Sequence, residues 1–369
     1  MSLLFSPYTI DTLDLKNRIV IPPMCQYSAI NGEASDWHII HLGQLAQSGA
    51  GLLIIEATAV EPEGRITPAD LGLWSDDTAQ ALEKVLRVVR QFSSMPIAIQ
   101  LAHAGRKAST EVPWRGGLQI PANAGGWQTL APSALPFAED EMTPTALDQA
   151  GLQRIIDRFV SAAQRAVQLG LDAIEIHAAH GYLLHEFLSP ISNTRADEYG
   201  GSLENRLRFP LAVFQAVRAA VPSIPVGIRI SATDWIEGGW DIEQSLVFAH
   251  ALGKASCSFM HVSSGGLSPA QKIPVGPDFQ VPLAERIRHE TGLPTISVGL
   301  IIEPEQAEAI ISEGRADLVA IGRGMLYNPR WPWHAAAKLG GQVEAPPQYW
   351  RAQPHGVAKL FGEGKFRLR

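Results

Sequence analysis

Eight short apolar segments, separated by longer amphipathic stretches, constrain the fold of this chain more than any other feature of its sequence. They lie at 18–24, 51–60, 96–103, 173–180, 225–231, 259–266, 294–301 and 317–324. Each segment has the length and the Val, Ile and Ala content of one strand, and strands that alternate with helices form parallel sheets. Eight strand and helix repeats close into a (β/α)8 barrel, which is the fold we predict.

Helices are expected between the strands, several of them beginning after Asp, Ser or Thr-Pro. The predicted ranges are 77–93, 145–169, 204–220, 242–253, 280–291 and 304–313. A doubly wound sheet is the alternative for such an alternation, and it normally carries G-x-G-x-x-G after its first strand. The segment "GAGLLI" at 49–54 has two of these glycines and precedes its strand, so we interpret it as a turn.

Two segments extend beyond a minimal barrel. Residues 104–143 are rich in Pro, Gly and Trp and separate the third strand from its helix, so we interpret them as an insertion that caps the barrel mouth. Residues 340–369 follow the last helix and carry several aromatic side chains, among them Phe361 and Phe366, which favours a docked tail. A chain of 369 residues suits one barrel, and we expect a single domain over 1–369.

Charge and cysteine content exclude several classes of function. The net charge is −7 and the basic residues are scattered, so we expect neither nucleic acid nor an anionic membrane as a partner. No apolar run approaches the roughly 18 residues of a spanning helix, and "MSLLFSPYTI" lacks the pattern of a signal peptide, so we expect a cytoplasmic protein. Cys25 and Cys257 lie outside any C-x-x-C, which argues against a disulfide framework, a zinc knuckle and an iron–sulfur cluster.

Polar residues gather at the carboxyl ends of the predicted strands, where barrel enzymes carry their active sites. They are Cys25, Tyr27, Gln100, His103, His177, His180, Arg229 and Arg323. Alternation along the strands turns Arg229, Glu175 and His177 toward the barrel interior. Because a buried arginine or glutamate is unfavourable unless it is paired or bound to a ligand, we expect Arg229 and Glu175 to share a polar network.

The last three strands end in glycine-rich sequences, "SSGG" (263–266), "VGLI" (298–301) and "IGRG" (321–324). Late barrel loops that offer backbone N–H groups commonly bind phosphate in this fold. The sequence therefore predicts a phosphate site there, although any one of these glycines also suits an ordinary turn.

His177 and His180, in "HAAHGY", admit three interpretations. They are ligands of a metal together with Glu175, or core histidines, or a pair of N–H donors that holds a substrate oxygen and stabilises charge developing on it. We favour the third, because Tyr182 follows as a competent proton donor. The grouping alone leaves all three open.

Five motifs resemble the Old Yellow Enzyme family of FMN-dependent ene-reductases. They are "PPMCQYS" (22–28), "EATAVEPEGRITPADLGLWSD" (56–76), "QLAHAGRKA" (100–108), "HAAHGYLLHEFLSPISNTRADEYGGSLENRLRF" (177–209) and "ADLVAIGRGML" (316–326). The resemblance covers essentially the whole chain. The cysteine of the first motif and "APPQYWR" (345–351) resemble the bacterial, thermophilic-like branch.

The resemblance implies a barrel that binds FMN non-covalently, takes electrons from NADPH or NADH, and passes a hydride to the β-carbon of an activated alkene. The residues that match cofactor-binding positions are Pro22, Pro23, Met24, Cys25 and Ala57 along the flavin, Gln100 and Arg229 at its polar edge, and Gly322 and Arg323 at the phosphate. The Arg229 charge would favour the anionic reduced ring.

The same comparison implies roles for the substrate pocket. His177 and His180 match the pair that binds the carbonyl or nitro group, and Tyr182 matches the acid that protonates the α-carbon. Tyr27 matches a substrate contact, and Cys25 matches a thiol that touches the flavin and tunes its potential. No metal is implied. A metal-dependent hydrolase using His177, His180 and Glu175 and a flavin-binding sensor without turnover are the competing hypotheses.

Arg351 matches an arginine that reaches into the pocket of a neighbouring subunit, so we expect a homodimer or homotetramer. The chain continues for about eighteen residues beyond this position, which distinguishes it from shorter relatives.

Overall fold

Eight parallel strands form a closed barrel in this computed structural model, which describes all residues except 1, 358 and 363–369. The barrel strands are β3 (Ile19–Ile21), β4 (Leu52–Ala59), β5 (Ile97–Ala102), β8 (Ala173–Ala178), β9 (Val226–Ser231), β10 (Met260–Ser263), β11 (Thr295–Val298) and β12 (Leu318–Ala320). Neighbours follow chain order, and β12 pairs with β3 to close the ring. All eight predicted segments, and the barrel itself, are confirmed.

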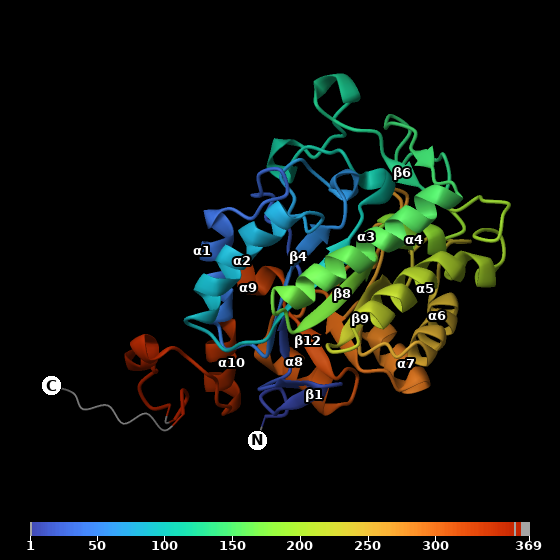
Figure 1. The fold of residues 1–369 in the computed structure, drawn as a ribbon. Coiled ribbons are helices and arrows are strands. Elements are labelled where there is room, and N and C mark those ends of the chain that lie inside the picture. Colours follow the sequence, from blue (N-terminus) through green and yellow to red (C-terminus); the bar gives the residue numbers. More distant parts are fainter. Residues whose placement is uncertain (1, 358, 363–369) are drawn as a thin grey trace.

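Helices surround the barrel (Figure 1). They are α1 (Asp36–Ala46), α2 (Asp76–Arg90), α3 (Gln149–Gln168), α4 (Leu183–Leu188), α5 (Leu203–Ala220), α6 (Ile242–Lys254), α7 (Val281–Thr291), α8 (Pro304–Ser312), α9 (Arg323–Tyr327) and α10 (Trp331–Leu339). The six helices whose ranges were predicted are present, and α10 ends directly before the predicted tail, whereas no range was predicted for α1, α4 and α9. Two of the missed helices, α4 and α9, are six and five residues long, too short for a helical period to be recognised.

The predicted start of the third helix at 145 is wrong. Thr145–Ala146 form the short strand β7, which pairs with β6 (Leu130–Ala131). The helix begins after Asp148, whose side chain accepts a hydrogen bond from the N–H of Gly151 at 2.7 Å.

Side chains that alternate along the strands build two separate cores. Those facing outward, such as Val226, Ile228 and Ile230 of β9, pack against the helices. Those facing inward near the amino ends form a compact plug with Ile10 and Leu15. These two residues belong to the N-terminal hairpin of β1 (Tyr8–Ile10) and β2 (Leu13–Leu15), which lies at the foot of the barrel in Figure 1.

The insertion 104–143 lies at the opposite end of the barrel from β1 (Figure 1). It contacts loops that follow barrel strands: the ring of Trp114 lies 5.9 Å from that of Tyr27, and the indole N–H of Trp127 donates to the carbonyl of Glu63. These contacts put the insertion beside the carboxyl ends of the strands.

The described part of the tail packs on α10 at the other end. Leu360 and Phe361 are buried with Trp333, and the N–H of Val343 donates to the carbonyl of Leu360 at 2.9 Å. Docking is thus observed at Leu360 and Phe361, and Phe366 lies outside the described residues.

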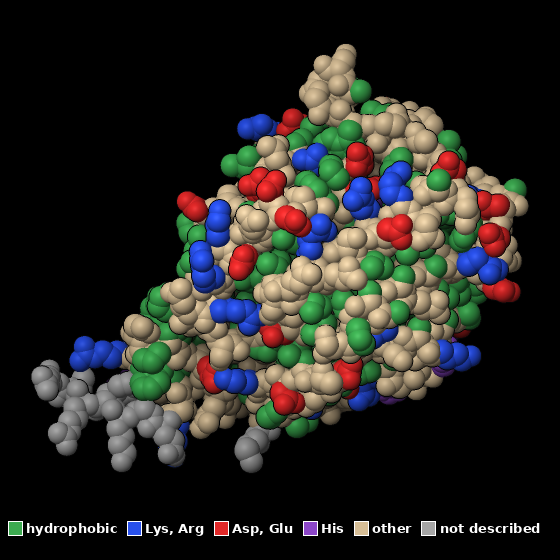
Figure 2. Space-filling model, in the orientation of Figure 1, with side chains coloured by type: hydrophobic (Ala, Val, Ile, Leu, Met, Phe, Trp, Pro, Cys, Tyr) green, Lys and Arg blue, Asp and Glu red, His purple; other side chains and the backbone are tan. Residues whose placement is uncertain are grey.

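Acidic and basic side chains are interspersed over the face drawn in Figure 2, with apolar side chains between them. No described helix combines the length and the apolar character that a bilayer crossing requires.

Phe259 fills the barrel interior, and its ring occupies the space beside Gly227, where an added Cβ would lie 2.5 Å from the ring. We expect Phe259→Ala to lower the free energy of unfolding by about 3–5 kcal/mol, because it leaves a cavity that the closed sheet is unable to fill. Urea unfolding measures this difference. Phe92→Ala is the matched control, since Phe92 is 61% exposed and its loss should change stability by no more than about 0.5 kcal/mol. Equal effects of the two substitutions would contradict this description of the core.

Candidate active site

The loop after β3, residues 22–28, is fastened to the next strand by a buried carboxylate. Glu56 of β4 accepts a hydrogen bond from the N–H of Gln26 at 2.7 Å, and its other oxygen lies 3.4 Å from Nε2 of His38. The register of β4 against β5 shifts between Ile55 and Ala57, so that the strand bulges where it meets this loop. This contact fixes the peptide that follows Cys25.

Cys25 and Tyr27 both remain protonated at neutral pH. Burial, with the nearby carboxylates of Asp70 and Glu56, raises the pKa of the Cys25 thiol well above its ordinary value. Burial and the proximity of Cys25 likewise raise the pKa of Tyr27, whose backbone is left-handed at φ 49°. The neutral thiol of Cys25 is a poor nucleophile, but because the residue as a whole is only partly buried, it is a competent contact for a ligand.

A polar layer crosses the barrel interior above the apolar plug. Glu175 of β8 accepts hydrogen bonds from Nε2 of Gln100 at 2.6 Å and from Nδ1 of His261 at 2.8 Å. All three side chains are buried. Gln100 and His261 therefore satisfy both oxygens of the expected interior glutamate.

Arg229 lies in the same layer, in register with His177 and His261, and is 8% exposed. Among the described residues its guanidinium makes no hydrogen bond, and Nε is fully buried without a partner. Burial lowers the pKa of Arg229 and the charge of Glu175 opposes that shift, but the two side chains do not form an ion pair within the described chain. A buried, charged donor without a partner is strongly unfavourable, so this position suits a polar or anionic ligand.

The last barrel loop meets the first one. A Cβ added at Gly322 would lie 3.6 Å from Cγ of Pro22 and 3.7 Å from Sδ of Met24, so the loops after β12 and β3 form adjacent walls. Gly322 precedes the short helix α9, and Gly299 after β11 has φ 116°, a conformation that side chains rarely adopt. A short extra helix after the last strand is the usual phosphate site of barrels. Arg323 at its start is exposed.

His177 and His180 face one another, with His177 Nε2 and His180 Nδ1 3.3 Å apart. The N–H of Ala179 donates to Nδ1 of His177, so the proton of His177 lies on Nε2, on the side of His180. Nε2 of His180 lies 2.9 Å from Oγ of Ser263. Burial, reinforced by the charge of Arg229, lowers the pKa of both imidazoles well below the ordinary value, so both rings are neutral.

Tyr182 completes this group. Its ring lies 4.9 Å from that of His177, and burial raises its pKa well above the ordinary value, so the phenol keeps its proton. The ammonium group of Lys107 lies 5.3 Å from the centre of the same ring and donates to the carbonyls of His180 and Gly266, each at 2.9 Å. Lys107 thus links the loop after β8 to the loop after β10, beside the histidine pair.

Glu186 of α4 lies near Lys107 and contacts the preceding residue of the chain, Arg106. One of its oxygens accepts the N–H of Arg106 at 2.9 Å, and the other is buried without a hydrogen-bond partner among the described residues. Burial raises the pKa of Glu186 to about 8, although Arg106 and Lys107 act in the opposite direction. Burial also lowers the pKa of Lys107 to about 8, against the effect of Glu186.

Sequence reasoning missed several of these residues. His261 alternates with two outward-facing residues on β10, so the alternation that identified Arg229 would have identified it too. Ser263, expected in the glycine-rich "SSGG" end of a phosphate site, lies against His180. Lys107 and Gln280, which accepts a hydrogen bond from Ser264, lie outside the barrel strands and give no periodic signal. His103 directly follows β5, as expected, and its Nε2 lies 3.1 Å from the buried carboxylate of Glu61, away from the histidine pair.

Arg351 is not brought into this group. It lies, exposed, in the 3₁₀ turn Pro347–Ala352, next to α10 at the foot of the barrel. A cavity of about 480 Å³ there is bounded by the tail and by Asn17, Gly51 and Pro96, each of which precedes a barrel strand. Arg351 therefore lies at the amino ends of the strands, whereas the histidine pair lies at their carboxyl ends.

The geometry gives the metal interpretation little support. Among the described residues, no three His, Cys, Asp or Glu side chains are grouped so as to hold a metal ion. Both oxygens of Glu175, the carboxylate considered for such a site, already accept hydrogen bonds.

Residues 3–342 match the model of the NADH:flavin oxidoreductase / NADH oxidase family. An NADPH dehydrogenase of Geobacillus thermodenitrificans (strain NG80-2) is 46% identical over 352 residues, which are 95% of this chain and 98% of that protein. An NADPH dehydrogenase of Listeria innocua serovar 6a is 44% identical over 354 residues, 95% and 99% of the two chains.

Solved structures are similar over comparable lengths. Morphinone reductase superposes with a TM-score of 0.75 at 30% identity, covering 94% of this chain and 92% of its own, and it has also been solved in complex with tetrahydroNAD. A 2-naphthoyl-CoA reductase superposes with a TM-score of 0.81, covering 92% of this chain and 52% of its own, and at 24% identity it shows a shared fold alone.

Glu186 makes stability depend on pH in a defined direction. Its pKa in the folded protein, about 8, lies above the ordinary 4.5, so the folded state binds the proton more tightly. Its contribution to the free energy of unfolding is therefore complete below pH 4.5 and falls as pH rises toward 8, by at most about 1.4 kcal/mol per pH unit. We expect Glu186→Gln, compared with the unmodified protein by urea unfolding between pH 5 and 8, to abolish this fall.

Lys107→Met is the control for that measurement. Lys107 has a depressed pKa of about 8 against 10.5, so its own contribution to stability rises between pH 8 and 10.5. Because Lys107 holds the pKa of Glu186 down, its removal should keep the fall below pH 8 and extend it to higher pH. An undiminished fall below pH 8 in Glu186→Gln would mean that another group titrates there.

Proposed function

The chain belongs to the NADH:flavin oxidoreductase / NADH oxidase family, the Old Yellow Enzyme family, and from this membership we propose that it reduces the C=C bond of alkenes activated by a carbonyl or nitro group. As a member of this family it is an FMN-dependent NADPH dehydrogenase. The observation that carries the finer proposal is the pair of neutral imidazoles, His177 and His180, with the protonated phenol of Tyr182 beside them.

FMN, when bound, supplies the hydride that reaches the β-carbon of the alkene. The residues at the carboxyl ends of the strands fit this cofactor. The unpartnered guanidinium of Arg229 suits the electron-rich edge of the ring together with Gln100, and Gly322 and Arg323, at the start of α9, suit the phosphate. We assign Pro22, Pro23, Met24, Cys25 and Ala57 to the walls along the ring.

The histidines hold the oxygen of the activating group. His177 already has its proton on Nε2, the atom that faces His180. For His180 also to donate from Nδ1, its Nε2 must be the acceptor, so the hydroxyl of Ser263 must donate to it in place of Oε1 of Gln280, which lies 3.4 Å from the hydroxyl. Two N–H donors converging on one oxygen stabilise the negative charge that develops there as the alkene is reduced.

Tyr182 delivers the proton to the α-carbon. Its raised pKa keeps the phenol loaded at neutral pH, and the Lys107 ammonium over its ring favours the phenolate that remains after transfer. The neutral thiol of Cys25 supports a contact with flavin and substrate and not a covalent role, and Tyr27 across the mouth suits a substrate contact.

We further propose a homodimer or homotetramer in which Arg351 enters the pocket of a neighbouring subunit. Its place at the foot of the barrel, away from the histidine pair of its own chain, supports this proposal. The Cys25 motif and "APPQYWR" support membership of the thermophilic-like branch. We retain one domain for the chain, and the cytoplasmic location expected from the sequence stays a prediction.

The test is whether the protein turns over. We expect the purified protein to be yellow, to lose its colour when NADPH is added without oxygen, and to regain it when cyclohexenone or maleimide follows. Absorbance near the flavin maximum measures both steps. A flavin-binding sensor would hold FMN without recolouring after the alkene is added, and a colourless protein that takes up no added FMN would refute the proposal.

Replacing Tyr182 separates the two half-reactions. We expect Tyr182→Phe to slow the alkene step by on the order of 10²-fold or more, because the general acid is lost, and to leave flavin reduction by NADPH nearly unchanged. Stopped-flow absorbance resolves the two rates. Tyr199→Phe is the matched control, since Tyr199 packs against Phe209 away from the histidine pair. Equal slowing of both half-reactions by Tyr182→Phe would remove Tyr182 as the acid.

A further inference from the structure

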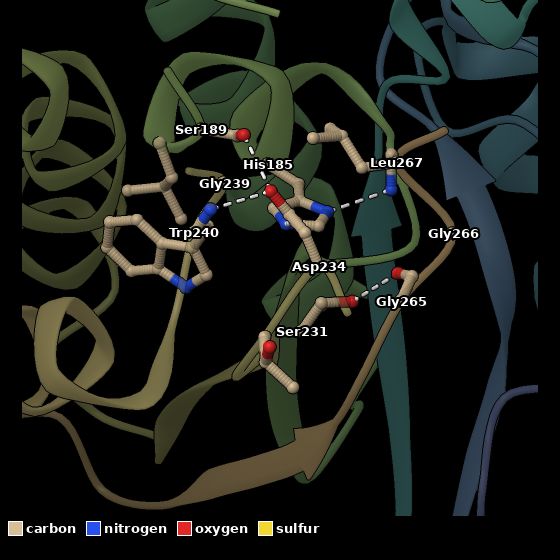
Figure 3. A network of polar contacts seen from close by, with 12 residues as sticks. His185, Ser189, Ser231, Asp234, Gly239, Trp240, Gly265, Gly266 and Leu267 are labelled. Atoms are coloured by element: carbon tan, nitrogen blue, oxygen red, sulfur yellow. Dashed lines mark hydrogen bonds and ion pairs between the residues drawn. The ribbon is translucent and has the colours of Figure 1, made fainter. Parts of the chain in front are cut away.

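One more buried histidine, His185, follows "HAAHGY" (177–182) and belongs to none of the groups assigned above. His185, in α4, lies against Asp234, which follows β9, and neither side chain has any exposed surface. Asp234 Oδ2 accepts hydrogen bonds from Oγ of Ser189 and from the N–H of Trp240, both at 2.7 Å. Figure 3 shows this carboxylate enclosed between the three partners.

The other carboxylate oxygen faces the imidazole. Oδ1 of Asp234 lies 2.9 Å from Nε2 of His185, and neither atom makes a hydrogen bond within the described chain, so the contact is chiefly electrostatic. Burial alone would raise the pKa of Asp234, but His185 and the bonds from Ser189 and Trp240 hold it below its usual value. The carboxylate is thus ionised, and it favours the tautomer of His185 with its proton on Nε2.

The remaining ring nitrogen of His185 contacts the loop between β8 and α4, residues 179–182, which we call the substrate loop. Nδ1 accepts the N–H of Gly181 at 2.9 Å, which requires Nδ1 to carry no proton. Gly181 is the residue between His180 and Tyr182. Asp234 therefore contacts His185, and His185 in turn binds the backbone between the proposed substrate-binding histidine and the proposed acid. A tautomer reversal would set two N–H groups against one another.

That peptide has an unusual conformation. His180 has φ 59° and Gly181 has φ 76°, and left-handed backbone is uncommon for a histidine. Oγ of Ser231 accepts the N–H of His180 at 2.9 Å and donates to the carbonyl of Gly265 at 2.8 Å.

The neighbouring loop leaves no room for adjustment. A Cβ at Gly181 would lie 2.2 Å from the carbonyl oxygen of Gly266, and one at Gly266 would lie 2.5 Å from Cα of His180. Ser231 and the loop at Gly266 thus hold the His180–Gly181 segment on one side. On the side of α4, its contact is the hydrogen bond from the N–H of Gly181 to His185.

We propose that Asp234 and His185 are positioning residues for the proposed alkene reduction: by fixing the His185 tautomer they hold the Gly181 peptide, and thereby the relative orientation of His180 and Tyr182. This inference rests on the proposed function of those two residues. It assigns to the buried pair an effect on binding and protonation of the substrate, beyond its contribution to stability.

The substitution that tests this is Asp234→Asn, made in the full-length, FMN-loaded protein. The amide preserves size but can donate to Nε2 of His185, which drives the imidazole proton to Nδ1, against the N–H of Gly181. We expect the Kd for 4-hydroxybenzaldehyde, read from the change in the flavin spectrum, to rise between about 10-fold and 100-fold. We also expect the alkene half-reaction to slow by a similar factor at unchanged FMN content.

Ser189→Ala is the matched control. It removes one hydrogen bond from the same carboxylate and leaves the His185 tautomer as it is, so phenol binding should stay within about twofold of the unmodified protein. If Ser189→Ala weakened binding as much as Asp234→Asn did, or if Asp234→Asn bound the phenol normally, the pair would be structural and the proposal wrong.

A rescue variant and a direct measurement cover the case in which Asp234→Asn folds poorly. His185→Asn places an amide oxygen near the position of Nδ1, so adding it to Asp234→Asn should restore part of the phenol binding, and no recovery would contradict the proposal. The ¹⁵N shifts of His185 in the unmodified protein report the tautomer directly, and a proton found on Nδ1 would overturn the proposal whatever the variants do.

These outcomes are separable from failure of the proposed function. If the unmodified protein binds FMN and phenols but never recolours with cyclohexenone, the proposed function fails, while the tautomer and the binding data still decide the role of the pair.

Discussion

Closure of eight parallel strands into one ring brings ionisable side chains from distant parts of the chain into a layer from which water is excluded, and every charge in that layer needs a partner. The chain sets carboxylates against histidines both in that layer, where the pair is Glu175 and His261, and around the barrel. Glu175 contacts His261, Glu61 contacts His103, Asp234 contacts His185 and Glu56 contacts His38. Arg229 has no such ion pair among the described residues, so it remains available to a polar ligand.

Burial also sets the protonation states of the side chains at the carboxyl ends of the strands, which we call the rim. Burial lowers the pKa of His177 and His180 and raises those of Cys25 and Tyr182, so each of these groups is driven to its neutral form. Neutral imidazoles and a phenol donate hydrogen bonds without introducing further charge into the layer. A rim of this kind favours a reaction in which negative charge appears on the substrate and is then removed by a proton.

The pair of Asp234 and His185 has a proposed role beyond stability, because His185 also holds the backbone of the substrate loop. His103 and His38 likewise accept a backbone N–H on Nδ1, from Gly105 and Ser35, but the N–H that His185 accepts belongs to Gly181, between His180 and Tyr182. A left-handed histidine followed by glycine does not retain its orientation by backbone preference alone. Contacts from Ser231, Lys107 and His185 supply that orientation from three directions.

The sequence by itself determined the barrel, the inward direction of Arg229 and Glu175, and the grouping of the histidines with Tyr182, because strand alternation and motif spacing are local properties of the chain. It also held enough to find His261. Only the tertiary structure decided that Glu175 binds Gln100 and His261 and not Arg229, that Lys107 and Asp234 reach the substrate loop, and that Arg351 lies away from the site of its own chain. These are contacts between segments far apart in sequence, and partner choice among buried polar groups depends on side-chain packing and distance, which no periodicity records.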